Sequence, residues 1–100
     1  MLRDFDELFS RFDIILGSST LKCAPSVDAT MDSIFPGGNV IEAAENLMGL
    51  PGVSIPCGFS KQNLPIGLKI IGRPFAEADI LEAAHLYQSL TEWHKKYPKL

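Results

Sequence analysis

The residues able to do chemistry in this chain are few and widely spaced. Cys23 and Cys57 do not form a Cys-x-x-Cys motif, so their spacing predicts neither a zinc site nor a redox pair, and we expect two buried thiols rather than a disulfide. His85 and His94 would point to opposite faces of one continuous helix, at about 100° per residue. The pattern therefore predicts no metal site and no pair of cooperating histidines.

Two further stretches carry nucleophiles or charges. The run Gly17-Ser18-Ser19 contains hydroxyl groups, but a nucleophilic serine also needs a base within reach, and we interpret this run as a strand-terminating turn. Use of Cys57 as a nucleophile is disfavoured because cysteines in strands are usually buried. Arg73 is either an anion-binding residue or a solvated arginine in a turn, and we favour the second. Asp28 and Asp32 are expected to be solvated loop acids.

Composition limits the classes of function. One hundred residues allow one domain at most, and 46% hydrophobic with 21% charged residues is typical of a globular chain. The net charge of −3 is mixed along the sequence, so no basic stripe predicts a nucleic-acid site. No apolar run is long enough to span a bilayer, and the acidic, amphipathic start does not resemble a signal peptide, so a cytoplasmic location is expected.

The elements that would position these residues centre on a predicted hairpin. Apolar residues alternate over 53–58, a polar Asn/Pro break follows, and the apolar pattern resumes over 66–71. Two short strands joined by a polar turn predict an antiparallel pair. Pro56 has no backbone N–H, so the first strand should be an edge strand, be bulged, or have ended by that point.

Three helices and a third strand are predicted to flank the hairpin. A short amphipathic helix starts near Asp4, and the apolar run Ile14-Ile15-Leu16 predicts a strand covered on both faces. A second helix begins at Asn39, with Glu42 completing a capping box, and ends at Gly49. The last helix begins at Glu77 or Asp79 and runs to Lys96, with an expected Glu92–Lys96 pair. Its core stripe comprises Ile80, Ala83, Ala84, Tyr87 and Leu90.

The segments NLMGLPGVSIPCGF and LPIGLKIIGRPF, followed by a helix and the ending TEWHKKYPKL, resemble the C-terminal end of amidase-signature enzymes. Within that family they are most similar to the A subunits of glutamyl-tRNA(Gln)/aspartyl-tRNA(Asn) amidotransferases. The resemblance implies an α/β/α layered fold in which residues 1–100 form a single partial domain, with about three strands and three helices. It also implies glutamine hydrolysis by a Ser–cis-Ser–Lys arrangement, which supplies ammonia for amidation of mischarged tRNA.

The resemblance also bears on site residues, cofactors and partners. The family's catalytic serines and lysine belong to motifs upstream of this region, so we expect no catalytic residue and no activity in this chain alone. An acid that holds the amino group of glutamine in these subunits aligns with Asn39, which keeps an acceptor oxygen but lacks the charge. Capping of the helix is our preferred role for Asn39. The family implies ATP and Mg only in a partner subunit, and the remaining amidase domain and the other subunits as partners.

Two alternatives stay open at this stage. The chain could be a fragment of a general amidase, because the Asn-Leu-x-Gly-Leu-Pro-Gly motif is shared across the family. It could also be a non-catalytic small α/β interaction domain whose open sheet edges permit self-association.

Overall fold

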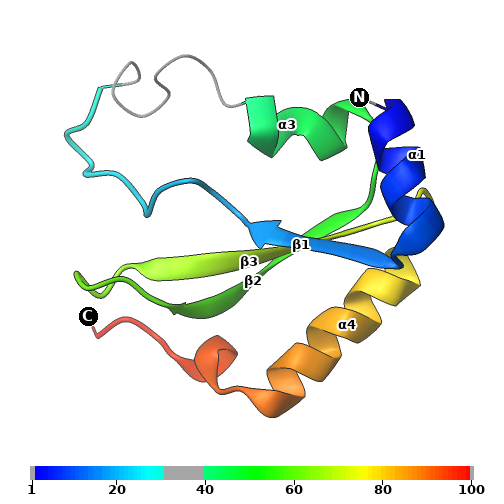
Figure 1. The fold of residues 1–100 in the computed structure, drawn as a ribbon. Coiled ribbons are helices and arrows are strands. Elements are labelled where there is room, and N and C mark those ends of the chain that lie inside the picture. Colours follow the sequence, from blue (N-terminus) through cyan, green and yellow to red (C-terminus); the bar gives the residue numbers. More distant parts are fainter. Residues whose placement is uncertain (1, 31–39, 100) are drawn as a thin grey trace.

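The computed structural model describes residues 2–30 and 40–99, which form a three-stranded sheet with helices on both faces. Figure 1 shows α3 over one face of the sheet and α4 over the other. The elements are α1 (Leu2–Arg11), β1 (Ile14–Ser18), α3 (Val40–Leu47), β2 (Gly52–Phe59), β3 (Pro65–Gly72), α4 (Glu77–Leu90) and the 3-10 helix η1 (Trp93–Lys95). The predicted α/β layered class, with three strands and three α-helices, is confirmed for this part of the chain.

The sheet has the order β1-β3-β2, and both pairings are antiparallel. The predicted hairpin is therefore present, and each of its strands extends one residue further at both ends than the sequence indicated. Pro56 lies on an edge strand, and the register shifts between Pro56 and Gly58 as in a β-bulge. Both placements avoid the need for a proline N–H within the ladder.

The core lies between the sheet and α4. Ile55 and Ile70 from the sheet pack against Ile80 and Ala84 from the helix, and all four side chains are buried. Gly72 allows this close approach, because a Cβ there would lie 2.6 Å from Cγ2 of Ile80. The predicted stripe of α4 is confirmed except at Leu90, which is 77% exposed.

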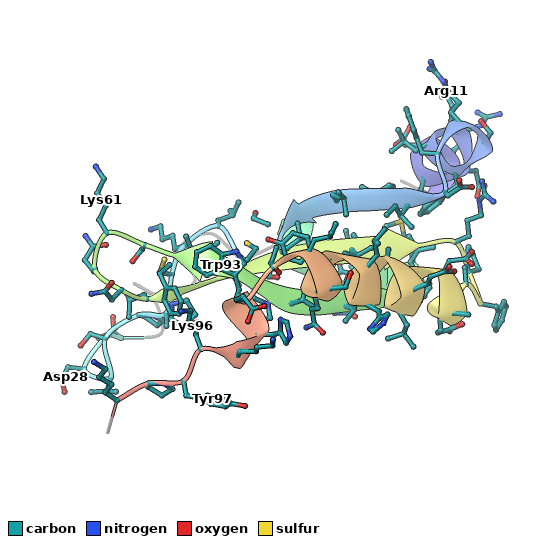
Figure 2. All side chains as sticks on the ribbon, turned by 90° about the horizontal axis from the view of Figure 1, so that it is seen from below. Arg11, Asp28, Lys61, Trp93, Lys96 and Tyr97 are labelled. Atoms are coloured by element: carbon teal, nitrogen blue, oxygen red, sulfur yellow. The ribbon has the colours of Figure 1, made fainter. Side chains whose placement is uncertain are left out.

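The last helix is shorter than predicted. It ends at Leu90, because Thr91 adopts an extended conformation and its hydroxyl donates a hydrogen bond of 3.0 Å to the carbonyl of Tyr87. The chain then turns back into η1, where the Trp93 ring meets the Phe59 ring of β2 edge-on, with centroids 6.1 Å apart. This aromatic contact, with Trp93 labelled in Figure 2, holds the end of the chain against the sheet.

The structure also differs from the predictions for the first helix and the first strand. The first helix begins at Leu2, so Asp4 lies in its first turn rather than before it. Strand β1 has the predicted position, but Leu16 is 59% exposed, so this strand is not covered on both faces by the described residues. The reason is its place at the edge of the sheet, beside the helix-covered strands rather than under α4.

Candidate functional site

The two faces of the sheet differ in chemistry. Side chains that are opposite each other on antiparallel strands point to the same face. Val53 and Ile55 face α4 together with their β3 partners Ile70 and Leu68. The other face, under α3, carries the register partners Ser54 and Lys69. Polar groups are therefore concentrated on the α3 side of the sheet.

Glu45 of α3 and Lys69 of β3 form a salt bridge between the helix and this face. The Glu45 side chain is 7% exposed and that of Lys69 is 18% exposed. Each charge has been removed from most of its water, and each is compensated by the other. The pair therefore fixes where α3 lies on the sheet.

The end of α3 positions Glu45 through backbone hydrogen bonds. The N–H of Leu50 donates to the carbonyl of Glu45 at 2.9 Å, and the N–H of Gly49 donates to the carbonyl of Asn46 at 3.3 Å. Gly49 has φ of +67°, so the two bonds and this residue make a Schellman motif, and the predicted end of the helix at Gly49 is confirmed. The chain then enters β2 directly, which places α3 over its own hairpin.

Two serine hydroxyl groups meet on the same face of the sheet. Ser19 Oγ and Ser54 Oγ share a hydrogen bond, although Ser19 follows β1 and Ser54 lies on β2. Between them lies Gly67 of β3, where a Cβ would be 2.5 Å from Ser19 Oγ and 2.8 Å from Ser19 Cβ. A glycine on the central strand is what lets the two edge strands exchange this bond.

Glu45, Lys69, Ser19 and Ser54 together form what we call the α3-side polar face. Its lysine is engaged with a carboxylate, and its hydroxyls bond to each other. A nucleophilic serine needs a base oriented toward it, and the described contacts supply none. This face can hold α3 against the sheet and present polar groups there. Its described contacts do not make a complete catalytic set. Among residues 2–30 and 40–99, no group of three or more His, Cys, Asp or Glu side chains could hold a metal ion.

The candidate residues from the sequence do not meet in one place. Asn39 and Asp32 lie outside the described residues. Asp28 is exposed in a turn, as expected for a loop acid, and its N–H lies 3.4 Å from Ser26 Oγ. Ser18 ends β1, and Ser19 still pairs with β3 through a 3.0 Å bond to the carbonyl of Gly67. The predicted turn is therefore wrong for Gly17 and Ser18, which belong to β1, and the chain bends only from Ser19.

Arg73 is exposed in a bend after β3, as favoured from the sequence, but its guanidinium is also bonded to other parts of the chain. Its guanidinium donates to the carbonyl of Phe9 from Nε at 3.1 Å and from an Nη at 2.6 Å, and to the carbonyl of Phe12 at 3.2 Å. Asp13 lies 3.4 Å away as a further partner. A cation at the carbonyl end of a helix satisfies orphan acceptors and complements the helix dipole. Arg73 thus joins the end of α1 to the end of β3.

The cysteines and histidines also differ from expectation. Cys23 and Cys57 are free, as predicted, but both are half-buried rather than buried. His85 is exposed on α4, whereas His94 lies in η1, so the two do not share one helix. Glu92 pairs with Lys95 instead of Lys96, with 2.9 Å between Oε2 and Nζ, because the chain there is a 3-10 turn.

Sequence reasoning missed the Glu45–Lys69 pair. A signal was present: Ile66, Leu68 and Ile70 alternate on one face, so Lys69 must lie on the other face of the same strand. The helical spacing of α3 could not show which of its residues faces the sheet until the strand order was known.

Comparison with known proteins gives the class. A protein-family model described as Amidase matches residues 1–81, and the chain belongs to this family. No helix in the described part of the chain has the length and apolar character needed to cross a membrane.

The particular relatives share one name. The A subunit of glutamyl-tRNA(Gln) amidotransferase from Oceanobacillus iheyensis is 43% identical over 99 residues, covering 97% of this chain and 20% of the relative. The protein of the same name from Thiobacillus denitrificans is 42% identical over 100 residues, covering 96% and 20%. The crystal structure of the corresponding protein from Thermotoga maritima is similar with a TM-score of 0.67 and 34% identity, over 76% of this chain and 17% of that one. The chain thus spans about a fifth of the length of these relatives.

Proposed function

We propose that this chain is the C-terminal part of the A subunit of a glutamyl-tRNA(Gln)/aspartyl-tRNA(Asn) amidotransferase. In this role it completes the sheet of the amidase domain and contributes one wall of the substrate pocket. The proposal is carried by the 43% identity to a protein of this name, which extends over 97% of the chain.

The range of the similarity favours this subunit over a general amidase. The family model ends at residue 81, whereas the alignments to the amidotransferase proteins continue through most of α4 and the segment after it. That region contains the Thr-Glu-Trp-His-Lys-Lys-Tyr-Pro ending.

In the proposed role, glutamine hydrolysis is performed by catalytic serines and a lysine outside this chain. The α3-side polar face contributes position rather than chemistry, since its lysine and hydroxyls are already paired. ATP and Mg belong to a partner subunit in this proposal, and the other subunits and the remaining amidase domain are the partners. The proposed location is the cytoplasm.

Glutaminase measurements test the proposal. The purified chain is expected to release no ammonia from glutamine above a buffer blank. The complement is the Oceanobacillus iheyensis relative from which the 99 matching residues have been deleted, which we call the truncated relative. Adding the chain to this complement is expected to produce glutaminase activity that neither protein has alone. Turnover by the chain alone, or a mixture as inactive as its parts, would refute the proposal.

A further inference from the structure

Helix α4 is an outer layer of the molecule. Its buried side chains, Ile80 and Ala84, face the sheet, and no described element lies on the far side of the helix (Figure 1). Domains of this class are built from two or three packed layers, so the three layers of an α/β/α fold end at α4. A body that covers the outer side of α4 is therefore separate from the layers of this domain.

Residues 86–99, which we call the end segment, leave apolar side chains uncovered. Leu86 is 60% exposed and Leu90 is more exposed still, and the two lie one helical turn apart on the same side of α4. Tyr97 follows η1 and is 84% exposed, and Figure 2 shows it clear of the helices and strands. Uncovered leucine and tyrosine side chains within one segment are typical of an interface with another protein.

The end segment is also basic, although the chain as a whole is acidic. It contains Lys95, Lys96 and Lys99 against one acid, Glu92, whereas the whole chain has a net charge of −3. Lys95 is paired with Glu92, with 2.9 Å between Nζ and Oε2, while Lys96 and Lys99 are exposed. Two lysines beside an apolar surface favour a partner that carries acidic side chains at the border of its own surface.

The combination of apolar and basic groups favours a protein partner over a nucleic acid. A nucleic acid would use the lysines for its phosphates and would leave Leu86 and Leu90 without a contact. The alignments to the amidotransferase proteins cover 97% and 96% of this chain and so extend into the end segment. Each of those proteins is named as one subunit of an assembly.

We propose that the end segment binds another subunit of the amidotransferase through its uncovered apolar side chains, which enter an apolar groove of that subunit. The two exposed lysines then lie beside acidic side chains at the rim of the groove. The inference rests on the proposed function for the identity of the assembly. The contact of Trp93 with Phe59 holds the segment against the sheet, so the surface is formed before the partner binds.

A matched pair of leucine variants tests this. The chain is mixed with the truncated relative, and its affinity for the remaining subunits of the Oceanobacillus iheyensis amidotransferase is measured by titration calorimetry. Leu86→Ser should weaken binding about tenfold, because it removes an anchor of the interface. Leu81→Ser is the control and should bind like the unaltered chain, since Leu81 is 59% exposed on the same helix but lies about 140° around it from Leu86. Equal affinities of the two variants overturn the inference.

A pair of lysine variants tests the charge of the same surface. Lys96→Glu should weaken binding about tenfold at low salt, and the effect should shrink at high salt because ions screen the attraction. Lys61→Glu, at the exposed tip of the hairpin, is the control and should have no effect at either salt concentration. Equal effects of the two charge reversals overturn the inference. This pair decides if Leu86→Ser lowers the thermal unfolding midpoint more than Leu81→Ser does.

The outcomes separate this inference from the proposed function. Glutaminase activity in the mixture, together with equal binding by Leu86→Ser and Leu81→Ser, overturns the inference and leaves the proposed function standing. Weaker binding by Leu86→Ser alone, in a mixture without glutaminase activity, supports the inference and refutes the proposed function. A dimer of the chain that Leu86→Ser dissociates identifies a second copy as the occupant. Binding of tRNA that Lys96→Glu weakens and Leu86→Ser does not identifies a nucleic acid, and either of these last two results overturns the inference.

Discussion

At the scale of single residues, the most consequential feature is the charge pair beneath α3. Glu45 and Lys69 come from different elements and are both largely buried. Neither charge is tolerable there without the other, because the cost of removing water from an ion is recovered only by a close partner. The stability of the helix–sheet contact therefore depends on both residues together.

We predict that Lys69→Met destabilises the chain by about 3 kcal/mol, because it leaves the Glu45 carboxylate buried without a cation. The midpoint of urea unfolding measures this. The control is Lys61→Met at the exposed tip of the hairpin, labelled in Figure 2, which should change stability by less than about 0.5 kcal/mol. The double variant Glu45→Leu/Lys69→Met should recover most of the loss, and equal losses for the single and double variants would contradict the interpretation.

Gly67 gives a second prediction at this scale. Gly67→Ala would place a Cβ 2.5 Å from Ser19 Oγ, so we expect a loss of about 1–3 kcal/mol from overpacking. Gly17→Ala is the matched control, because a Cβ at Gly17 has nothing within 4 Å. Thermal unfolding of the two variants distinguishes them, and similar behaviour would mean that the Ser19–Ser54 bond does not require this glycine.

Glu92 gives the prediction on pH. The hydrogen bond from Lys95, followed by the charge of Lys95, holds the pKa of Glu92 below its ordinary value of 4.5. A lowered folded-state pKa contributes stability above the unfolded-state pKa, and this contribution is lost as the pH falls through the folded-state value. In Lys95→Ala the pKa of Glu92 should rise toward 4.5, as followed by NMR titration of its carboxyl carbon. Because the pair is exposed, overall stability should change little, and Lys99→Ala is the control.

At the scale of elements, helix α1 is joined to the sheet by a contact between element ends. Helix α1 is amphipathic, but only Phe9 among its described apolar residues is buried, so packing alone holds it weakly. The guanidinium of Arg73 adds three hydrogen bonds to two carbonyls at the end of this helix. The planar, forked arginine can make these bonds at once, which a lysine cannot.

We therefore predict that Arg73→Lys and Arg73→Ala both loosen α1, with a loss of about 1–2 kcal/mol in its local opening free energy. Hydrogen exchange of the α1 amides is the measurement, and the hairpin amides should be unaffected. Arg3→Ala removes an exposed arginine of the same helix as a control. If the α1 amides exchange equally fast in all three variants, the hydrogen bonds of Arg73 do not hold this helix.

At the scale of the whole molecule, the unit is thin and leaves many large apolar side chains uncovered. Its principal extents are 43 × 36 × 18 Å, and many large apolar side chains remain exposed, including Leu16, Leu47 and Leu90. Exposed apolar area of this kind marks a surface that another part of a protein covers. The similarity to proteins about five times as long agrees with the idea that another part of a protein covers this surface.

The thermal unfolding midpoint of the chain tests whether the whole unit has a specific partner. Anything that binds the folded chain and not the unfolded chain stabilises it by mass action. The truncated relative is expected to raise the thermal unfolding midpoint of the chain progressively with concentration. Bovine serum albumin at equal concentration is the control, and an identical response to both would remove the evidence for a specific partner.

The sequence by itself determined the features that depend on local geometry. The alternation over 53–58 and 66–71 fixes the hairpin, Pro56 requires an edge or a bulge because it has no N–H, and the stripe of α4 follows from helical spacing. The break at Thr91 was not predicted: the helical spacing continues to Lys96, whereas the chain leaves the helix after Leu90 and Trp93 meets Phe59 of β2.

Only the tertiary structure decided that β3 lies in the centre of the sheet, between β1 and β2. That order brings Ser19 to Ser54 across Gly67, the end of α1 to Arg73, and Lys69 under Glu45. The physical reason is that these pairings arise from long-range strand neighbours and register, which no periodicity within a single segment contains.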